Sequence, residues 1–325
     1  MVRALAKGRL ALRLWNYTMG SEMGENLLIL GNGFDLDLGL HTRYSEFWES
    51  DRWDEVKGEC PEPYLINSLE KYRVTHNWFD LESGLLEGAK NLKGSISRNF
   101  DVSEYYDSFQ ILIQELRAYI KQQQESFTPT KNSVAERLLK VIDSRQVFKC
   151  IYTFNYTDIA KMSQRFHVSK LPLVQYVHGS LGPNEQIILG IEMEDFSSIP
   201  PQLTFLIKSN SPYYRYTNLL RDLNLADHVV FFGHSINGMD FPYFKDYFLQ
   251  LVEMRIPQEE KRHITIITYD ERSAMQIKDN FRANGIDVRS LFNKIALEFI
   301  MTKGVYEKNP LECDKLDRLI GDLKS

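Results

Sequence analysis

Short, continuous apolar runs recur along this chain, and segments with helical spacing separate most of them. A run that is apolar at every position is typical of a strand covered on both faces of a parallel sheet. Because strands that alternate with helices form such sheets, we predict an α/β fold of the Rossmann-like kind, with helices on both faces. The runs cover residues 27–30, 147–153, 173–177, 228–232, 263–268 and 295–301, with 187–191 as a further candidate.

Residues 51–146 interrupt this alternation with helices alone. Apolar residues recur there at the spacing of one helical face. Because a strand precedes the segment, we expect a large helical insertion within a single α/β domain that spans residues 26–325. The predicted helices of the insertion are 64–72, 78–90, 102–124 and 134–142. Outside it, helices are predicted at 42–48, 213–223 and 241–252, and from 311 onward.

Residues 1–25 form an N-terminal extension. Basic residues at four of the first 13 positions break up the apolar ones, so the segment is not typical of a secretory signal peptide. Two interpretations stay open. The extension is either a short basic amphipathic helix or the result of a start codon assigned upstream of the native one, at Met19 or Met23.

Composition narrows the function classes. The formal net charge is −5 and there is no long basic run, so nucleic acid is an unfavoured partner. No apolar stretch has the 18 or so residues of a membrane-spanning helix. The cysteines, Cys60, Cys150 and Cys313, lie far apart without the spacing of a zinc site, so we expect no metal. Few cysteines fit a reducing compartment, which predicts a cytoplasmic protein.

Four of the apolar runs end in glycine or polar residues. Because ligands bind outside the carboxyl ends of parallel strands, these clusters are expected to converge on one crevice. They are residues 31–35, 154–158, 178–180 and 233–235. In the first cluster, Gly31 and Gly33 are expected to adopt positive φ and to let the backbone approach a phosphate at a helix N-terminus. Leu36 stands where the dinucleotide fingerprint has its third glycine.

Single residues in these clusters have two interpretations each. Asn155 either caps a helix or holds a ribose hydroxyl or a water. His178 is either structural or a general base for such a hydroxyl or water. Asp240 either caps the next helix or binds the ligand. Glu82, in the compact acidic and aromatic group at 78–82, is a minor candidate for reaching the crevice.

Taken together, these motifs resemble the AbiH family of bacteriophage abortive infection proteins. The opening motif is Ile29-Leu30-Gly31-Asn32-Gly33-Phe34-Asp35, followed by Gly39, Thr42, Tyr44 and Phe47. The later motifs are Thr153-Phe154-Asn155-Tyr156-Thr157, His178-Gly179, and Gly233-His234-Ser235 with Asp240 and Tyr243-Phe244. The group Trp78-Phe79-Asp80-Leu81-Glu82 also fits, and the similarity runs from about residue 26 to about 300.

That family is similar, more remotely, to the sirtuin-like (DHS-like) NAD-binding fold. The resemblance implies NAD as substrate or ligand, with Asn155 and His178 as catalytic residues. The residues it implies for nucleotide binding are Gly31, Asn32, Gly33, Phe34, Asp35, Gly39, Thr42, Gly233, His234, Ser235 and Asp240. The zinc cysteines of sirtuins are absent between His178 and Gly233, and 41–44 replaces their Pro-Asp-Phe-Arg, so a protein deacylase is disfavoured.

Three functions follow as hypotheses. The first is an antiphage effector that binds NAD or a related nucleotide and hydrolyses it with water. The second is a nucleotide-binding sensor without turnover that engages a phage or host protein. The third is an effector that acts on nucleic acid, which the acidic net charge disfavours. The sequence leaves open the phage or host trigger and the assembly of several copies into a homo-oligomer.

Overall fold

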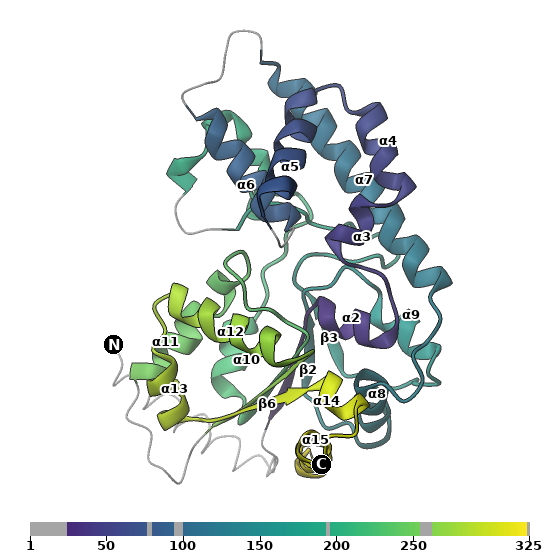
Figure 1. The fold of residues 1–325 in the computed structure, drawn as a ribbon, viewed down its shortest axis with the longest axis vertical. Helices are drawn as coiled ribbons and strands as arrows, with labels where there is room; N and C mark the ends of the chain where they lie inside the picture. The colour runs from purple at the N-terminus through teal and green to yellow at the C-terminus, as the bar shows by residue number, and fades with distance from the viewer. Residues whose placement is uncertain (1–24, 77–79, 94–99, 193–195, 254–261, 324–325) are drawn as a thin grey trace.

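A computed structural model describes residues 25–76, 80–93, 100–192, 196–253 and 262–323 (Figure 1). The predicted N-terminal extension lies outside these residues except for Glu25. The described strands form one parallel sheet in the order β3-β2-β1-β4-β5-β6, which confirms the predicted fold class. They are β1 (Asn26–Leu30), β2 (Cys150–Thr153), β3 (Leu173–Tyr176), β4 (His228–Phe232), β5 (His263–Thr268) and β6 (Ala296–Met301).

The sheet is covered on both faces because alternate residues of each strand point to opposite sides. In β1, Leu28 and Leu30 enter one apolar core while Leu27 and Ile29 enter the other. The first core is closed by α2 (Asn32–Leu38), α8 (Val134–Arg145), α9 (Ile159–Gln164) and α15 (Pro310–Asp322). The second is closed by α10 (Leu219–Leu225), α11 (Lys245–Glu253), α12 (Glu271–Ala283) and α13 (Val288–Lys294).

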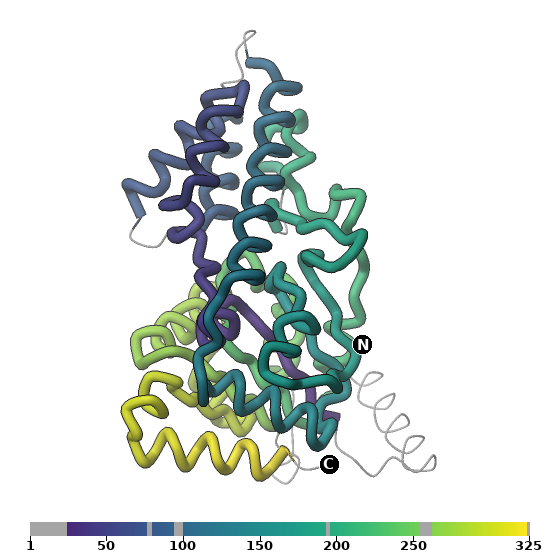
Figure 2. Tube along the Cα trace, turned by 90° about the vertical axis from the view of Figure 1, so that its right-hand side faces the viewer, coloured from purple at the N-terminus to yellow at the C-terminus, as the bar shows by residue number. Residues whose placement is uncertain are grey.

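The remaining helices of the predicted insertion stand beyond the carboxyl edge of the sheet, in the upper part of Figures 1 and 2. They pack around a third core, which the apolar side chains of 187–207 complete. These helices are α4 (Asp51–Glu59), α5 (Pro63–Thr75), α6 (Leu81–Leu92) and α7 (Val102–Ser126), and α3 (Tyr44–Trp48), which precedes the predicted insertion, packs with them. None of the described helices is both long and apolar enough to cross a bilayer.

Three expectations about single elements are wrong. Residues 187–191 form two isolated bridges and not a strand, because Ile187, Leu189 and Ile191 face the helices of the third core. The helix expected at 213–223 begins only at Leu219. The helix expected at 241–252 is split into a 3-10 turn, η4 (Phe241–Tyr243), and α11.

The glycines after β1 are needed for a close contact between two loops and not for positive φ. Gly31 has φ −124°, and Gly33 lies inside α2, outside the left-handed region. A Cβ atom on Gly31 would lie 2.5 Å from the Cα atom of His234, and one on Gly33 would lie 2.6 Å from the Cα atom of Gly233. Gly233 itself has φ +65°, and its Cβ would lie 2.3 Å from the amide nitrogen of Phe34. No turn separates β1 from α2, because Gly31 caps the helix and the helix begins at Asn32.

Gly233→Ala is expected to destabilise the protein by at least about 3 kcal/mol, because left-handed strain adds to overpacking against α2. Gly285→Ala is the matched control, since Gly285 also has positive φ but its Cβ would meet no described atom within 4 Å. It should cost about 1–2 kcal/mol. Urea unfolding of both variants measures the difference, and equal losses would contradict the close contact.

Candidate functional site

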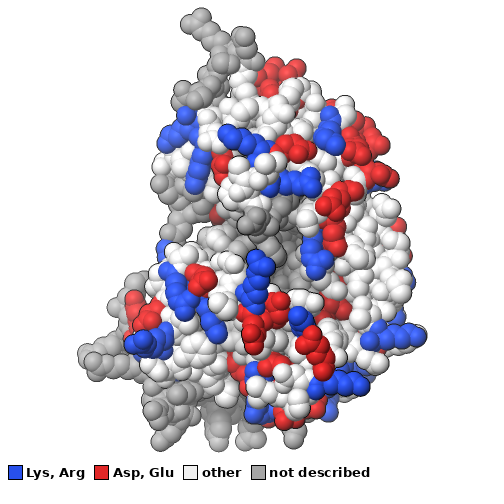
Figure 3. Space-filling model, viewed as in Figure 1, with Lys and Arg blue, Asp and Glu red and all other residues white. Residues whose placement is uncertain are grey.

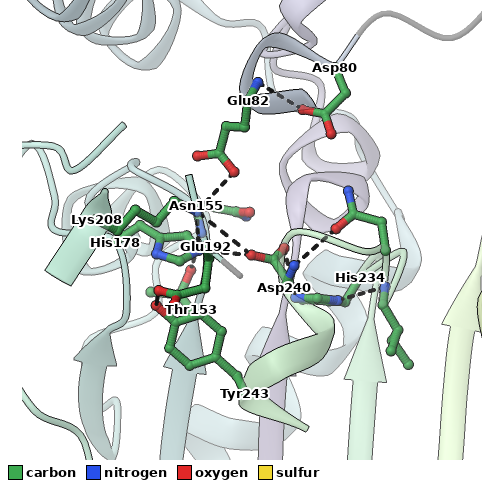
Figure 4. A network of polar contacts seen from close by, with 12 residues as sticks. Asp80, Glu82, Thr153, Asn155, His178, Glu192, Lys208, His234, Asp240 and Tyr243 are labelled. Carbon is green, nitrogen blue, oxygen red and sulfur yellow. Dashed lines mark hydrogen bonds and ion pairs between the residues drawn. The ribbon is translucent and has the colours of Figure 1, made fainter. Parts of the chain in front are cut away.

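Polar side chains from both parts of the molecule meet above the carboxyl edge of the sheet (Figure 4). His178 follows β3, His234 follows β4, and Asp240 directly precedes η4. Lys208 begins the 3-10 turn η3 (Lys208–Asn210), and Glu82 comes from the first turn of α6. Apart from the partly buried Asp240, each is less than a tenth exposed. We call these five residues the polar network.

His178 and Asp240 form the centre of the network. The Nε2 atom of His178 lies 2.9 Å from Oδ1 of Asp240, and Nδ1 is buried without a hydrogen-bond partner among the described residues. The ammonium of Lys208, 3.2 Å from the same nitrogen, can only donate and opposes a proton there, whereas the carboxylate, which only accepts, lies closer and favours the imidazole tautomer with the proton on Nε2. The lone pair of Nδ1 is then available. Asp240 makes no cap hydrogen bond to the described helix residues, so its interpretation as a helix cap is wrong.

Lys208 lies against the same imidazole and links it to the helical insertion. Its Nζ atom is 3.2 Å from Nε2 of His178, 2.8 Å from Oε2 of Glu82 and 3.9 Å from Oδ1 of Asp240. Glu82, a minor candidate in the sequence, thus contacts Lys208 in the polar network. Trp78 and Phe79 of the same motif lie outside the described residues, while Asp80 caps α6 through the amide of Glu82.

His234 approaches the other oxygen of Asp240. The backbone N–H of Ile236 donates to Nδ1 of His234 over 2.9 Å, so the neutral ring carries its proton on Nε2. Nε2 lies 3.6 Å from Oδ2 of Asp240. The ring of Phe154 separates the two histidines, with centroid distances of 5.2 Å to His178 and 4.5 Å to His234.

The charges of the network are unevenly shared. Burial and the charge of Lys208 lower the pKa of His178 to about 4, although Asp240 opposes the change. Burial also disfavours ionisation of Asp240, but the hydrogen bond from His178 and the charge of Lys208 hold its pKa below the usual range. Burial raises the pKa of Glu82 to about 8 against the pull of Lys208. At neutral pH the histidine is therefore an unprotonated base.

Asn155 belongs to a second buried group. Its Nδ2 donates to the carbonyl of Gly31 over 3.0 Å and to Oδ1 of Asp35 over 2.8 Å, and Thr157 Oγ1 donates to Oδ2 of Asp35 over 2.8 Å. Asp158, and not Asn155, caps α9. Both amide hydrogens of Asn155 are thus used, which leaves its carbonyl oxygen as the group that could meet a ligand, as an acceptor.

The predicted glycine loops donate most of their amides to the backbone. The N–H groups of Gly31, Gly33, Phe34 and Gly233 donate to carbonyl oxygens at 2.8–2.9 Å. These four donors have no hydrogen left for a pyrophosphate, so a bound phosphate would need other partners.

The predicted binding residues Asn32, Thr42, Gly39 and Ser235 make their hydrogen bonds outside the polar network. The hydroxyl Oγ1 of Thr42 donates a hydrogen bond to Oδ1 of Asn32 over 2.6 Å. Gly39 ends α2 in the left-handed conformation, with φ +103°. The backbone carbonyl of Ser235 accepts a hydrogen bond from Nδ2 of Asn280. Two surface hollows, of about 500 and 490 Å³, lie along α7, and Gly39 lines the first of them.

Sequence reasoning missed Lys208. The residue lies in a 3-10 segment without helical or strand periodicity, and its partner Glu82 is 126 positions away. The signal available in the sequence was a single lysine directly after the apolar residues 205–207. Among the described residues no cluster of three or more His, Cys, Asp or Glu side chains has the arrangement of a metal site. Basic and acidic side chains are interspersed on the face in Figure 3.

A protein-family model matches most of the chain. Residues 27–257 match the sequence model of a protein family described as Bacteriophage abortive infection AbiH. The match spans β1 to α11, and therefore includes the polar network and the Asn155–Asp35 group. A search of curated proteins finds no match.

Asp35 is expected to make stability depend on pH. Burial raises its pKa to about 7, although Thr157 and Asn155 oppose the change. The folded protein then keeps a proton that the unfolded chain releases above about pH 4, so this contribution is complete below pH 4 and is lost as pH rises through 7. Asp35→Asn, which cannot ionise and keeps the oxygen that accepts from Asn155, should remove roughly 2–4 kcal/mol of this pH dependence. Urea unfolding at pH 4 and pH 7.5 measures it, and parallel pH profiles of variant and wild type would contradict it.

Proposed function

The chain belongs to the AbiH family of bacteriophage abortive infection proteins, and we propose that it defends the cell by binding and hydrolysing NAD or a related nucleotide. Family membership implies antiphage defence. The nucleotide, the hydrolysis and a cytoplasmic site of action are our proposal. NAD is the substrate that the sirtuin-like order of sequence motifs favours.

One observation carries the hydrolytic part of the proposal. His178 is held by Asp240 at Nε2, while its Nδ1 is buried without a described partner. A neutral imidazole that a carboxylate orients in this way is the arrangement of a general base. The low pKa of His178 keeps it unprotonated at neutral pH.

The reaction uses water as the nucleophile. The oxygen of water attacks the ribose carbon of the N-glycosidic bond, and the bond breaks with its electron pair moving to the nicotinamide ring nitrogen. The proton of the water passes to Nδ1 of His178 and then to solvent. NAD and water thus give nicotinamide, ADP-ribose and a proton. In this scheme Asn155 accepts a hydrogen bond from the ribose or the water through its carbonyl oxygen.

A second candidate function rests on the closure of the network. Because Nδ1 of His178 is buried, a nucleotide must displace neighbouring side chains to reach it. A protein that binds a nucleotide beside a closed base, without turnover, would act as a sensor. In either function, binding of a phage or host protein, or self-assembly, would displace the side chains that cover Nδ1 of His178.

The deciding experiment is a thermal-shift assay with NAD, NADP and ADP-ribose, combined with mass spectrometry of the products. Stabilisation by NAD together with released nicotinamide supports the hydrolase. A protein that NAD stabilises but that releases no nicotinamide, even when lysate from phage-infected cells is added, favours the sensor. Absence of stabilisation by all three nucleotides contradicts nucleotide binding.

Two variants should separate the base from its orienting group. His178→Ala is expected to abolish nicotinamide release, and Asp240→Asn to lower its rate by roughly 10²–10⁴ because the imidazole loses its tautomer preference. His228→Gln is the control, since His228 is a partly buried histidine at the opposite end of β4. Full activity of His178→Ala, with an unchanged melting temperature, would remove His178 from this role.

A further inference from the structure

Two opposite charges compete for one atom of His178. Oδ1 of Asp240 lies 2.9 Å and Nζ of Lys208 lies 3.2 Å from the same nitrogen, Nε2. A carboxylate at this distance stabilises the imidazolium, whereas an ammonium destabilises it. The protonation state of His178 therefore depends on whether Lys208 is in place.

We propose that Lys208 is a positioning residue that keeps His178 neutral and available as a base, and that Glu82 of the helical insertion holds Lys208 there. With Lys208 present, the negative charge of Asp240 is balanced by the ammonium. Without it, the imidazole becomes the nearest group that can balance that charge. The use of the neutral base rests on the proposed function, but its protonation state does not.

The surroundings of His178 support this assignment. Lys208, Asp240 and His234 are the charged or titratable side chains that shift the pKa of its ring, and the phenol ring of Tyr243 also packs against it, at a centroid distance of 5.6 Å. His234 is neutral, because burial lowers its pKa, so Lys208 supplies the positive charge that opposes protonation. Glu82, Glu192 and Asp80 act on the network through Lys208 or Asp240.

Glu82 fixes the ammonium from the far side. Its Oε2 accepts from Nζ of Lys208 over 2.8 Å in a contact that is almost fully buried. Lys208 follows Ile207 and Leu206, which belong to the core of the insertion. The helical insertion thus determines, through one ion pair, the charge beside an imidazole that is anchored on the sheet.

Histidine ¹⁵N NMR of the intact protein tests the proposal without any substrate. The His178 resonances are assigned by their loss in His178→Gln. In the wild type they should report a neutral, Nε2-protonated ring throughout pH 5.5–8.5. In Lys208→Met the pKa of the ring should rise towards the ordinary value of about 6.5, because Asp240 then opposes burial alone. A His178 ring in Lys208→Met that stays neutral down to pH 5.5 overturns the proposal.

Controls separate positioning from structure. Lys315→Met removes a lysine that pairs with the buried Glu312 at 2.7 Å, far from the network, and should leave the His178 titration unchanged. If Lys208→Met fails to fold, the double variant Lys208→Met, Glu82→Gln also replaces the carboxyl group that contacts Nζ, so no buried ionisable partner is left at that contact. It should show the same titration of His178, and a neutral ring there also overturns the proposal.

Nicotinamide release gives a second readout. Lys208→Met should lose activity at pH 6 and recover it as pH rises above the new pKa of His178, whereas Lys208→Arg should keep the wild-type profile. A loss that is uniform between pH 6 and 9 contradicts the positioning role. If the wild type releases no nicotinamide, the proposed function fails, while the NMR result still decides the role of Lys208.

Discussion

The contact between two glycine-containing loops at the middle of the sheet is the constraint on which the site depends. β1 and β4 are neighbours where the strand order reverses, and the residues that follow them approach to backbone distance. Side chains at Gly31, Gly33 or Gly233 would separate these loops. With this approach, His234 lies near Asp240 after β4, and Asp35 of α2 accepts a hydrogen bond from Asn155 after β2.

The polar network is held by charge balance more than by the number of its hydrogen bonds. A buried carboxylate and a buried ammonium are each costly alone, and each is tolerated because the other is near. The histidine between them stays uncharged, which leaves one ring nitrogen unused. That nitrogen is one of several buried polar atoms without a hydrogen-bond partner among the described residues, and it belongs to a ring that contacts both a carboxylate and an ammonium.

The apolar runs predicted the six strands of the sheet because burial on both faces leaves a continuous signal. The same reasoning wrongly predicted a strand at 187–191, where the apolar side chains pack into the third core among the insertion helices. Polar clusters at strand ends located His178, His234 and Asp240, but not what they contact. Lys208 could not be predicted, because its partners are distant in sequence and its own segment has no periodicity. The role of Gly31 and Gly33 was also hidden, since only the fold shows that a second backbone occupies the space they leave.

The position of β1 at the centre of the sheet imposes an order on assembly. Leu27 pairs with Cys150 and with Val229, so both neighbours of the first strand are made long after it. At ribosomal speeds of about 10 residues per second, roughly 12 s pass before the first partner emerges and roughly 20 s before the second. The insertion helices, whose contacts are largely local, have time to form in that interval. Glu82 is synthesised well before Lys208, and β1 gains its second neighbour only when β4, which follows Lys208 in the chain, has emerged.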